Sequence, residues 1–353
     1  MLKIGIIGLA NVGKSSLFKA LTNKAVACAN FPFCTIEPNE GIVPVPDHRL
    51  NKLAQLTNSA KIIPTTIKFV DIAGLVRNAH KGEGLGNKFL GYIREVDLIL
   101  HLVRGFNKSD ISHVEKRIDP ADDIEIVQTE LILADLEAVS RQIEKVNKEA
   151  KSGDKNKISQ SLILNKIKNN LLSGKLARET KLTDEEALNH LNNLQLLTTK
   201  PMLIVVNCDE NIAGLKDKVK ANLYLPVLTE LNIQTAKEDE KQNYRQLLTD
   251  SGLNTIDDLI TACYRKLNLV TFLTTGQDET RAWTIEVGSK APKAGAAIHT
   301  DFEKKFIRAE VINWQKLIEV SSFALARTKG LLRLEGKDYM VQDGDVIEFK
   351  IQR

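Results

Sequence analysis

Short apolar runs of strand length alternate with helical patterns along the first and central parts of the chain. Most runs end at glycine or at a polar residue, which is typical of buried strands. The runs are Ile4–Ile7, Thr66–Val70, Leu98–Val103 and Met202–Val206, and the helical stretches between them include Asp47–Leu56 and Gly86–Ile93. This alternation predicts an α/β fold in which helices cover both faces of a mostly parallel sheet.

A different pattern occupies residues 121–199. Its apolar positions are spaced four and three residues apart, as in a coiled-coil seam, and are Ile132, Leu136, Val139, Ile143, Val146 and Ala150. Lys151–Lys157 contains Ser-Gly-Asp and is typical of a hairpin tip. A second helix is expected over Ile158–Leu172, and a third from Thr183, which forms a capping-box pattern with Glu186. We interpret 121–199 as a helical coiled-coil hairpin inserted into the α/β domain.

Short β-rich stretches predominate beyond residue 271. They are Thr284–Val287, Ile307–Val311 and Val346–Ile351, with turn signals at Gly288 and Asp343–Asp345. We therefore expect a separate small α+β domain over 271–353. The α/β domain would then comprise residues 1–120 and 200–270.

The composition is that of a folded protein without a membrane-spanning segment. Of 353 residues, 43% are apolar and 27% are charged, and the formal net charge is +4. The longest apolar runs are too short to cross a bilayer, and the first residues lack the pattern of a signal peptide. The cysteines, which show no paired spacing, are Cys28, Cys34, Cys208 and Cys263. We expect a cytoplasmic protein with no membrane partner, no disulfide and no cysteine-bound metal.

The segment Gly8–Ser15 matches the phosphate-loop pattern G-x-x-x-x-G-K-[ST] at every fixed position. Glycines let such a loop curl so that backbone N–H groups face phosphate oxygens, and the helix that follows directs its positive end to the same anion. Lys14 would reach the β- and γ-phosphates, and the Ser15 hydroxyl would bind Mg²⁺. The residues expected around the nucleotide are Asn11, Val12, Gly13, Lys14, Ser15 and Ser16. The chain is therefore expected to bind Mg-ATP or Mg-GTP.

Two further segments fit sensors of the γ-phosphate. Asp71 ends the Thr66–Val70 run and can hold Mg²⁺, and the N–H of Gly74 can touch the γ-phosphate. Thr35 lies between the two motifs and suits a second hydroxyl ligand of Mg²⁺. A surface turn at 71–74 and a threonine that simply starts a strand are the structural alternatives.

Three residues bear on hydrolysis. Leu75 occupies the place where Ras-like enzymes carry the glutamine that orients the attacking water, so another group must do this or intrinsic hydrolysis must be slow. His113 lies in a polar stretch and is our candidate, although an exposed loop histidine fits the pattern equally well. Asn11 could add a ligand for a potassium ion (K⁺) beside the phosphates, or it could be an ordinary loop residue.

The residues after the Met202–Val206 run favour ATP over GTP. Guanine-specific proteins of this class carry N-K-x-D here, whereas this chain has Asn-Cys-Asp-Glu over residues 207–210. The longer Glu210 replaces the aspartate that accepts from guanine. The Asn207 amide can both donate to and accept from adenine. A shifted register in which Asp209 binds guanine is the alternative.

These segments resemble the YchF or Obg-like ATPase family along almost the full length of the chain. The resemblance rests on Gly8–Ser16, Asn30–Gly41, Asp71–Leu90, Asn207–Glu210 and Ile298–Val311. It implies an ATP-preferring, Mg²⁺-dependent hydrolase of the Obg branch of P-loop GTPases that associates with ribosomes. It also implies a helical insertion and a C-terminal TGS domain with a ubiquitin-like β-grasp fold.

The resemblance also implies roles for individual residues. It assigns phosphate and Mg²⁺ binding to Lys14, Ser15, Thr35, Asp71 and Gly74, and contact with adenine to Asn207. Leu75 becomes the family's hydrophobic replacement for glutamine, and His113 matches its loop histidine. Two departures stand out: Ala10 replaces the usual proline, and Leu228–Glu230 matches the base-closing loop poorly, which leaves nucleotide selectivity open.

Positive charge is concentrated in the predicted hairpin. Arg141–Lys181 holds eleven Lys and Arg and four Asp and Glu, a local net charge of +7, which exceeds that of the whole chain. Such a hairpin suits contact with ribosomal RNA, whereas a solvated helix surface is the ordinary alternative. We expect a monomer. Three functions stay open: an ATPase switch, a GTPase of the same architecture, and a nucleotide-gated ribosome-binding module with negligible turnover.

Overall fold

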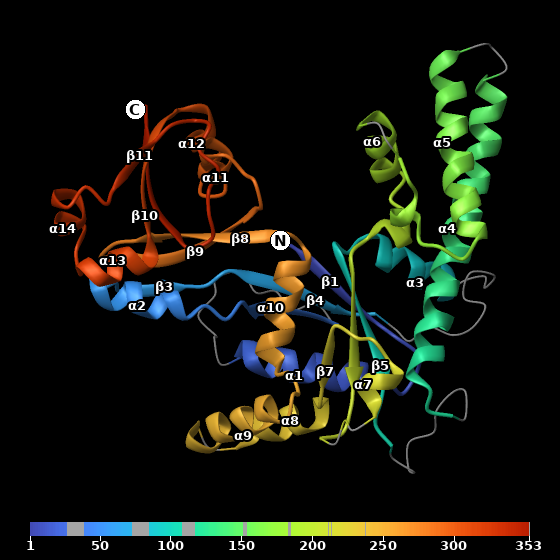
Figure 1. Cartoon of the computed structure of the whole chain (residues 1–353), viewed down its shortest axis with the longest axis horizontal. Helices are drawn as coiled ribbons and strands as arrows, with labels where there is room; N and C mark the ends of the chain where they lie inside the picture. Colours follow the sequence, from blue (N-terminus) through green and yellow to red (C-terminus); the bar gives the residue numbers. More distant parts are fainter. Residues whose placement is uncertain are drawn as a thin grey trace. The chain divides into compact units, whose positions relative to one another are not determined.

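The computed structural model describes residues 1–26, 39–72, 85–107, 117–150, 154–182, 185–210, 212, 214–236 and 238–352. The chain divides into two compact units, which Figure 1 shows in sequence colours. The first unit comprises Met1–Val43 and Lys68–Leu259, and the second comprises Pro44–Ile67 and Ile260–Arg353. The two units are therefore interleaved along the sequence.

The first unit is built on a mostly parallel sheet. In spatial order its strands are β2 (Glu40–Pro44), β4 (Thr66–Asp71), β1 (Lys3–Ile7), β5 (Leu98–Arg104), β6 (Met202–Asn207) and β7 (Leu223–Leu225). Strand β1 pairs in parallel with β4 and β5, and parallel pairing continues through β6 to β7. Every residue of β5 is buried, as expected for a central strand covered on both faces. All four apolar runs identified in the sequence are strands of this sheet.

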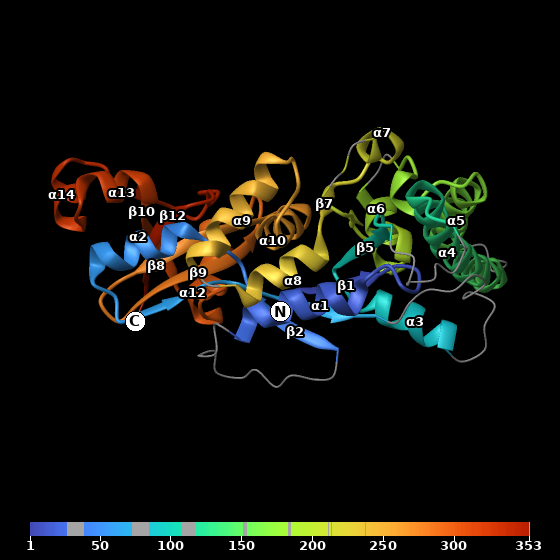
Figure 2. The ribbon, with the colours of Figure 1, turned by 90° about the horizontal axis from the view of Figure 1, so that it is seen from below.

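Helices alternate with these strands. They are α1 (Lys14–Val26), α3 (Leu85–Arg94), α4 (Pro120–Ala150), α5 (Lys155–Leu172), α6 (Glu185–Asn193), α7 (Leu215–Lys218), α8 (Val227–Thr235) and α9 (Glu238–Asp250), with 3₁₀ turns η2 (Ala177–Glu179) and η3 (Leu197–Thr199). Helix α10 (Ile256–Lys266) begins in this unit and continues from Ile260 in the second. Figure 2 shows α8 beside α1, where the Gln234 side chain donates to the Ala20 carbonyl at 2.6 Å. No helix among the described residues is long and apolar enough to span a membrane.

Helices α4 and α5 form the predicted hairpin, which Figure 1 shows as two adjacent helices extending away from the sheet. Val139 and Val146 of α4 pack in one buried cluster with Leu164 and Ile167 of α5. The spacing of four and three residues therefore identified the buried side of α4 correctly. Helix α5 begins after Asp154, whose side chain caps it by accepting from the backbone N–H two residues later at 2.8 Å.

A buried carboxylate ties α4 to the segment that leads back to the sheet. Asp135 has no exposed surface and accepts hydrogen bonds from the Leu197 N–H at 2.8 Å and the Thr198 N–H at 2.7 Å. It also accepts from the Thr198 hydroxyl at 2.6 Å. Burial raises the pKa of Asp135, although these hydrogen bonds oppose the shift. Two residues further on, Lys200 Nζ donates to the carbonyl of Arg94 at 2.8 Å, so one short segment contacts both α4 and the end of α3.

Replacing Asp135 with alanine is expected to lower the free energy of unfolding by about 2 to 4 kcal/mol, because the buried N–H groups of Leu197 and Thr198 lose their acceptor. Chemical denaturation followed by circular dichroism measures the change. Glu137→Ala is the matched control, because this side chain on the same helix is 55% exposed. The control is expected to change stability by less than about 0.5 kcal/mol. An equally small effect of Asp135→Ala would contradict the prediction.

The second unit is built on a mixed sheet. In spatial order its strands are β11 (Arg333–Glu335), β10 (Phe306–Asn313), β12 (Asp345–Ile351), β8 (Leu269–Thr275), β9 (Glu279–Glu286) and β3 (Lys61–Ile63). Strands β8 and β9 form an antiparallel hairpin, β12 lies parallel to β8, and β10 is antiparallel to both β12 and β11. The first and last strands after α10 are thus parallel neighbours at the centre, as in a β-grasp fold. The predicted C-terminal α+β domain is confirmed.

Both faces of this second sheet carry apolar clusters. One cluster contains Phe272 and Ile347 and includes Ala291 and Ala294 of α11 (Ala291–Ala296). The other cluster contains Leu273 and includes residues of α2 (His48–Thr57), α13 (Trp314–Val320) and α14 (Phe323–Thr328). The unit therefore has a core on each side of its sheet. The unit also contains the short helix α12 (Thr300–Lys304).

The domain division differs from the predicted one in two segments. We expected 1–120 and 200–270 to lie in the α/β domain. Residues 260–270 belong to the second unit, and so do residues 44–67. There β3 pairs with β9, and Leu50 and Leu53 of α2 are buried in a cluster with Leu273. Strand β3 has only three residues, and its partner β9 lies more than 200 residues later in the chain, so no local sequence pattern predicts the pairing. The hairpin 121–199 is part of the first unit and not a compact unit by itself.

Candidate nucleotide-binding site

The phosphate loop curls at the carboxyl end of β1. The backbone φ angle is +62° at Asn11 and +82° at Gly13, and both values lie in the region that asparagine and glycine adopt most readily. Gly8 approaches the next strand so closely that a Cβ atom would lie 2.3 Å from the carbonyl oxygen of Leu102. The glycines of the motif are therefore required by packing as well as by backbone conformation.

Asn207 braces this loop from the end of β6. Its Nδ2 donates to the Val12 carbonyl at 3.0 Å, and its Oδ1 accepts from the Val227 N–H at 3.3 Å. A Cβ atom on Gly13 would lie 2.5 Å from the same Nδ2. The buried Asn207 amide thus joins the phosphate loop, the end of β6 and the start of α8. One of its two amide protons is therefore committed to the loop.

Lys14, Ser15 and Asp71 meet at the loop. The Ser15 hydroxyl donates to Asp71 Oδ2 at 3.1 Å, and Lys14 Nζ donates to the Leu9 carbonyl at 3.2 Å. Burial lowers the pKa of Lys14, and the charge of Asp71 opposes this shift. Burial raises the pKa of Asp71, against the hydrogen bond from Ser15 and the charge of Lys14. The structure therefore brings together three of the residues that the motifs predicted.

The oxygen atoms of Ser15 and Asp71 fit a magnesium ion. Asp71 Oδ1 is buried, and no hydrogen-bond partner for it occurs within the described residues. Hydroxyl and carboxylate oxygens are ligands that Mg²⁺ prefers. No group of three or more His, Cys, Asp and Glu that could hold a metal occurs in the described parts of the chain.

The segment after β6 lies beside the start of α8. Glu210 Oε1 accepts from the Thr229 hydroxyl at 3.1 Å, and Asp209 Oδ2 accepts from the Asn107 N–H at 3.1 Å. Cys208 is buried, which raises the pKa of its thiol to about 12 and makes it unreactive at neutral pH. Glu230, in the segment that matches the family loop poorly, is a buried residue that accepts from a backbone N–H of α10 at 3.1 Å.

Several residues with predicted roles lie outside the described residues, and their roles stay predictions: Thr35, Gly74, Leu75 and His113. Ser16 is an exposed residue in the first turn of α1. The hydrogen bond from Asn207 to the Val12 carbonyl of the loop, and the one that Asn207 accepts from the Val227 N–H, were not anticipated. Both join Asn207 to backbone groups, so no side-chain pattern in the sequence marks them.

The curled loop lies between the first parallel strand and its helix, and its lysine and serine lie beside an aspartate at the end of the neighbouring strand. This arrangement defines the class of P-loop nucleoside triphosphatases. Residues 3–132 match a family model described as "50S ribosome-binding GTPase". Residues 269–352 match a model for the C-terminal part of the YchF GTPases, described as a protein of unknown function.

Similar proteins match the chain almost from end to end. "Ribosome-binding ATPase YchF" of Haemophilus ducreyi is 48% identical over 99% of this chain and 98% of its own length. The Bacillus subtilis protein of the same name is 46% identical over 99% of this chain and 99% of its own length. The structure of the Schizosaccharomyces pombe YchF GTPase matches with a TM-score of 0.84 and 33% identity, over 99% of this chain and 97% of that one. The chain belongs to the YchF family.

Proposed function

We propose that this protein is a Mg²⁺-dependent ATPase that associates with the ribosome and prefers ATP to GTP. The observation that carries the proposal is the meeting of Lys14, Ser15 and Asp71 at the curled loop. Relatives that match over nearly their whole length are named ribosome-binding ATPases, and we transfer that activity to this chain. We further propose a cytoplasmic monomer whose ribosome affinity depends on the bound nucleotide.

Each residue of the site has its own proposed role in binding or hydrolysis. Backbone N–H groups of the loop and the positive end of α1 hold the phosphates, and Lys14 adds an ammonium group to the β- and γ-oxygens. Ser15 and Asp71 would hold Mg²⁺, which when bound neutralises charge that develops on the phosphates. Thr35 and Gly74 are proposed to sense the γ-phosphate, and His113 to orient water because leucine at 75 cannot. Asn11 is a proposed ligand for K⁺.

The residue types after β6 support adenine as the preferred base. Guanine requires a carboxylate that accepts two N–H groups at once, and the guanine-specific pattern places an aspartate where this chain has the longer Glu210. In the structure Asp209 accepts from the Asn107 N–H and Glu210 accepts from Thr229, and each carboxylate can still accept further hydrogen bonds. The Haemophilus ducreyi relative is named an ATPase, and the Schizosaccharomyces pombe protein is named a GTPase.

We expect ATP to bind more tightly than GTP, and Glu210→Asp to shift the ratio of the two dissociation constants toward GTP by about tenfold, because the shorter carboxylate matches the guanine-binding pattern. Titration with fluorescent ATP and GTP analogues in the presence of Mg²⁺ measures both constants. Glu240→Asp, an exposed position on α9, is the matched control and should leave the ratio unchanged. GTP binding tenfold tighter than ATP in the unaltered protein would overturn the assignment.

A second candidate is a nucleotide-gated ribosome-binding module with negligible turnover, which is favoured by leucine in place of the water-orienting glutamine at position 75. Single-turnover hydrolysis of ATP with and without ribosomes distinguishes the two. A rate that ribosomes raise identifies an ATPase. A rate that stays near zero in both conditions identifies a binding module.

A further inference from the structure

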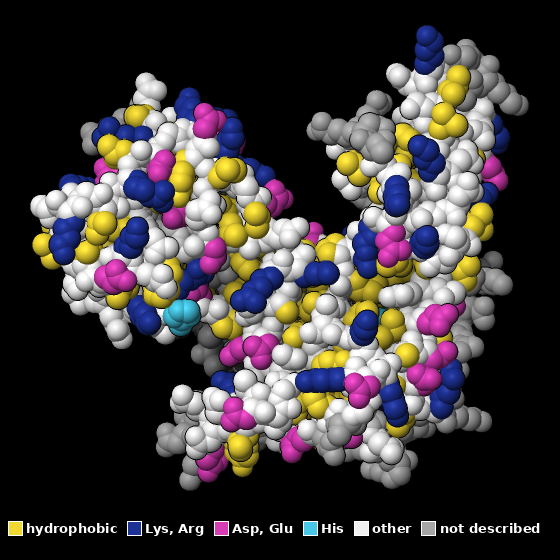
Figure 3. All heavy atoms as spheres, in the orientation of Figure 1, with side chains coloured by type: hydrophobic (Ala, Val, Ile, Leu, Met, Phe, Trp, Pro, Cys, Tyr) yellow, Lys and Arg dark blue, Asp and Glu magenta, His cyan; other side chains and the backbone are white. Residues whose placement is uncertain are grey.

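One side of helix α5 is exposed and differs in character from the rest of the hairpin. Its opposite side packs against α4 through Ile163, Leu164, Ile167 and Leu171. The exposed residues follow helical spacing and are Lys155, Ile158, Ser159, Leu162, Asn165, Lys166, Asn169 and Leu172, which together we call the α5 outer face. In Figure 3 the hairpin, at the upper right, shows mainly basic and hydrophobic side chains and few acidic ones.

Charge is distributed unequally between the two helices of the hairpin. Helix α5 contains four lysines and no Asp or Glu, whereas α4 contains eight acidic and three basic residues. Lys157 pairs with Glu149 of α4 at 2.7 Å. Lys155 and Lys166 on the α5 outer face have no ion pair within the part of the chain that the structure describes. The positive charge of this face is therefore not compensated by its own helix.

Aliphatic side chains lie among these lysines. Leu162 is 62% exposed and Ile158, one turn earlier, is 47% exposed. A helix face that only meets water is expected to mix both signs of charge and to expose few large aliphatic groups. The α5 outer face thus combines exposed leucine and isoleucine with asparagines and with lysines whose charge is not compensated. This combination indicates a face that contacts a partner carrying both negative charge and apolar surface.

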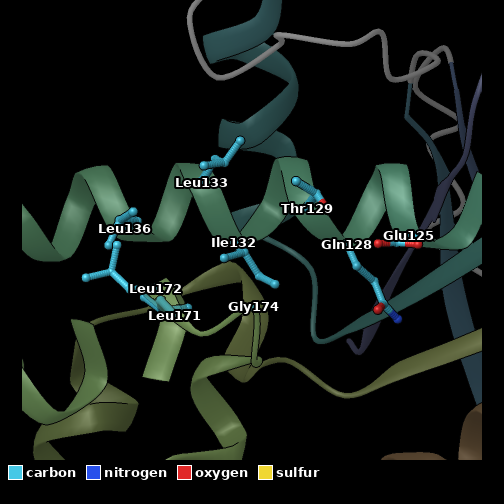
Figure 4. A pocket seen from close by; sticks show the side chains of 9 residues that line it. All are labelled: Glu125, Gln128, Thr129, Ile132, Leu133, Leu136, Leu171, Leu172 and Gly174. Carbon is cyan, nitrogen blue, oxygen red and sulfur yellow. The ribbon is translucent and has the colours of Figure 1, made fainter. Parts of the chain in front are cut away.

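A groove at the base of the hairpin meets this face only at Leu172. It has a volume of about 300 Å³ and lies where α4 meets the end of α5. Figure 4 shows Glu125 and Gln128 at one end of the groove and Leu133, Leu136 and Leu172 at the other. Acidic Glu125 makes the groove unsuitable for a phosphate, so the lysine-bearing turns of α5 nearer the tip are the better surface for an anionic partner.

We propose that the α5 outer face binds the sugar–phosphate backbone of ribosomal RNA. Lys155 and Lys166 would contact phosphates, Asn165 and Asn169 would hydrogen-bond phosphate or 2′-hydroxyl oxygens, and Leu162 would pack against ribose or an unstacked base. The inference rests on the proposed ribosome association and assigns it to one face of one helix.

The test compares ribosome binding of the full chain with that of a Lys155→Glu, Lys166→Glu double variant. Co-sedimentation with salt-washed ribosomes, in the presence of a non-hydrolysable ATP analogue, gives the affinity at several salt concentrations. We expect at least about tenfold weaker binding, and a slope of log affinity against log salt that falls by about 0.7 to 0.9 per lost phosphate contact. Lys218→Glu with Lys220→Glu, exposed on and after α7, makes the same charge change elsewhere in the first unit and should bind like the unaltered protein.

Different results separate this inference from the proposed function. ATP affinity without ribosomes should be equal in all variants, because the substitutions lie away from the phosphate loop. An unaltered protein that fails to bind ribosomes overturns both proposals. Equal ribosome binding by the α5 double variant and the unaltered protein overturns the RNA-binding face alone. A loss caused by Leu162→Ser but not by the lysine substitutions also overturns it, and points to a ribosomal protein as the partner.

Discussion

Replacing Lys14 with alanine is expected to weaken binding of Mg-ATP by about a hundredfold. The ammonium group sits within the curled loop, with Nζ 3.2 Å from the Leu9 carbonyl, where it can reach the phosphates. Its burial makes water a poor substitute, and a charge-assisted hydrogen bond contributes about 1.5 to 3 kcal/mol. The upper end of that range corresponds to the expected loss of affinity. Equilibrium titration with a fluorescent ATP analogue measures it.

Lys19→Ala is the matched control for this prediction. Lys19 is an exposed residue on the same helix, α1, so its removal makes the same change in net charge. We expect its ATP affinity to stay within about twofold of the unaltered protein, as for a surface substitution away from the site. Binding by Lys14→Ala that equals the control would remove Lys14 from the phosphate site and with it the proposed function.

Introducing alanine at Gly13 is expected to abolish nucleotide binding and to lower the free energy of unfolding by about 2 to 4 kcal/mol. The backbone φ of +82° is unfavourable for a residue with a Cβ atom. The added atom would also lie 2.5 Å from Asn207 Nδ2, which therefore has to move. When the Asn207 side chain moves, it loses its hydrogen bonds to the Val12 carbonyl and the Val227 N–H. Denaturation and ATP titration measure the two effects separately.

Gly91→Ala tests whether these losses are specific to the loop. Gly91 lies within α3, and nothing lies within 4 Å of a Cβ atom placed on it. Alanine at such a helical position is expected to leave nucleotide affinity unchanged and to stabilise the protein by about 0.4 to 1 kcal/mol. Normal stability and binding of Gly13→Ala would show that the loop adjusts to the extra atom, contrary to the prediction.

Sequence reasoning was most reliable where a pattern is local. The spacing of Val139 and Val146 identified the buried side of α4, because a helix repeats its faces every few residues. The phosphate motif similarly placed Lys14 and Ser15 at the start of α1, because its function depends on consecutive backbone atoms. Asp71 was identified as their partner from its place at the end of a strand, and its carboxylate does accept from the Ser15 hydroxyl.

Non-local relations were not visible in the sequence. Residues 44–67 were assigned to the wrong side of a domain boundary because β3 is short and pairs with a strand far along the chain. Asn207 was interpreted only as a base contact, whereas the structure shows its amide bound to Val12 and Val227. In holding the loop, Asn207 bonds to two backbone groups. Such groups occur in nearly every residue type, so the sequence does not mark them.

The sequence by itself determined the class of the protein, the position of the phosphate-loop motif and the presence of a basic helical hairpin, because each follows from residues that are close together in the chain. The tertiary structure alone decided that an amide from β6 holds the loop in place. It also decided that 44–67 completes the second unit and which side of α5 is left exposed by packing against α4. These features arise from packing between distant segments, which the order of residues along the chain does not display.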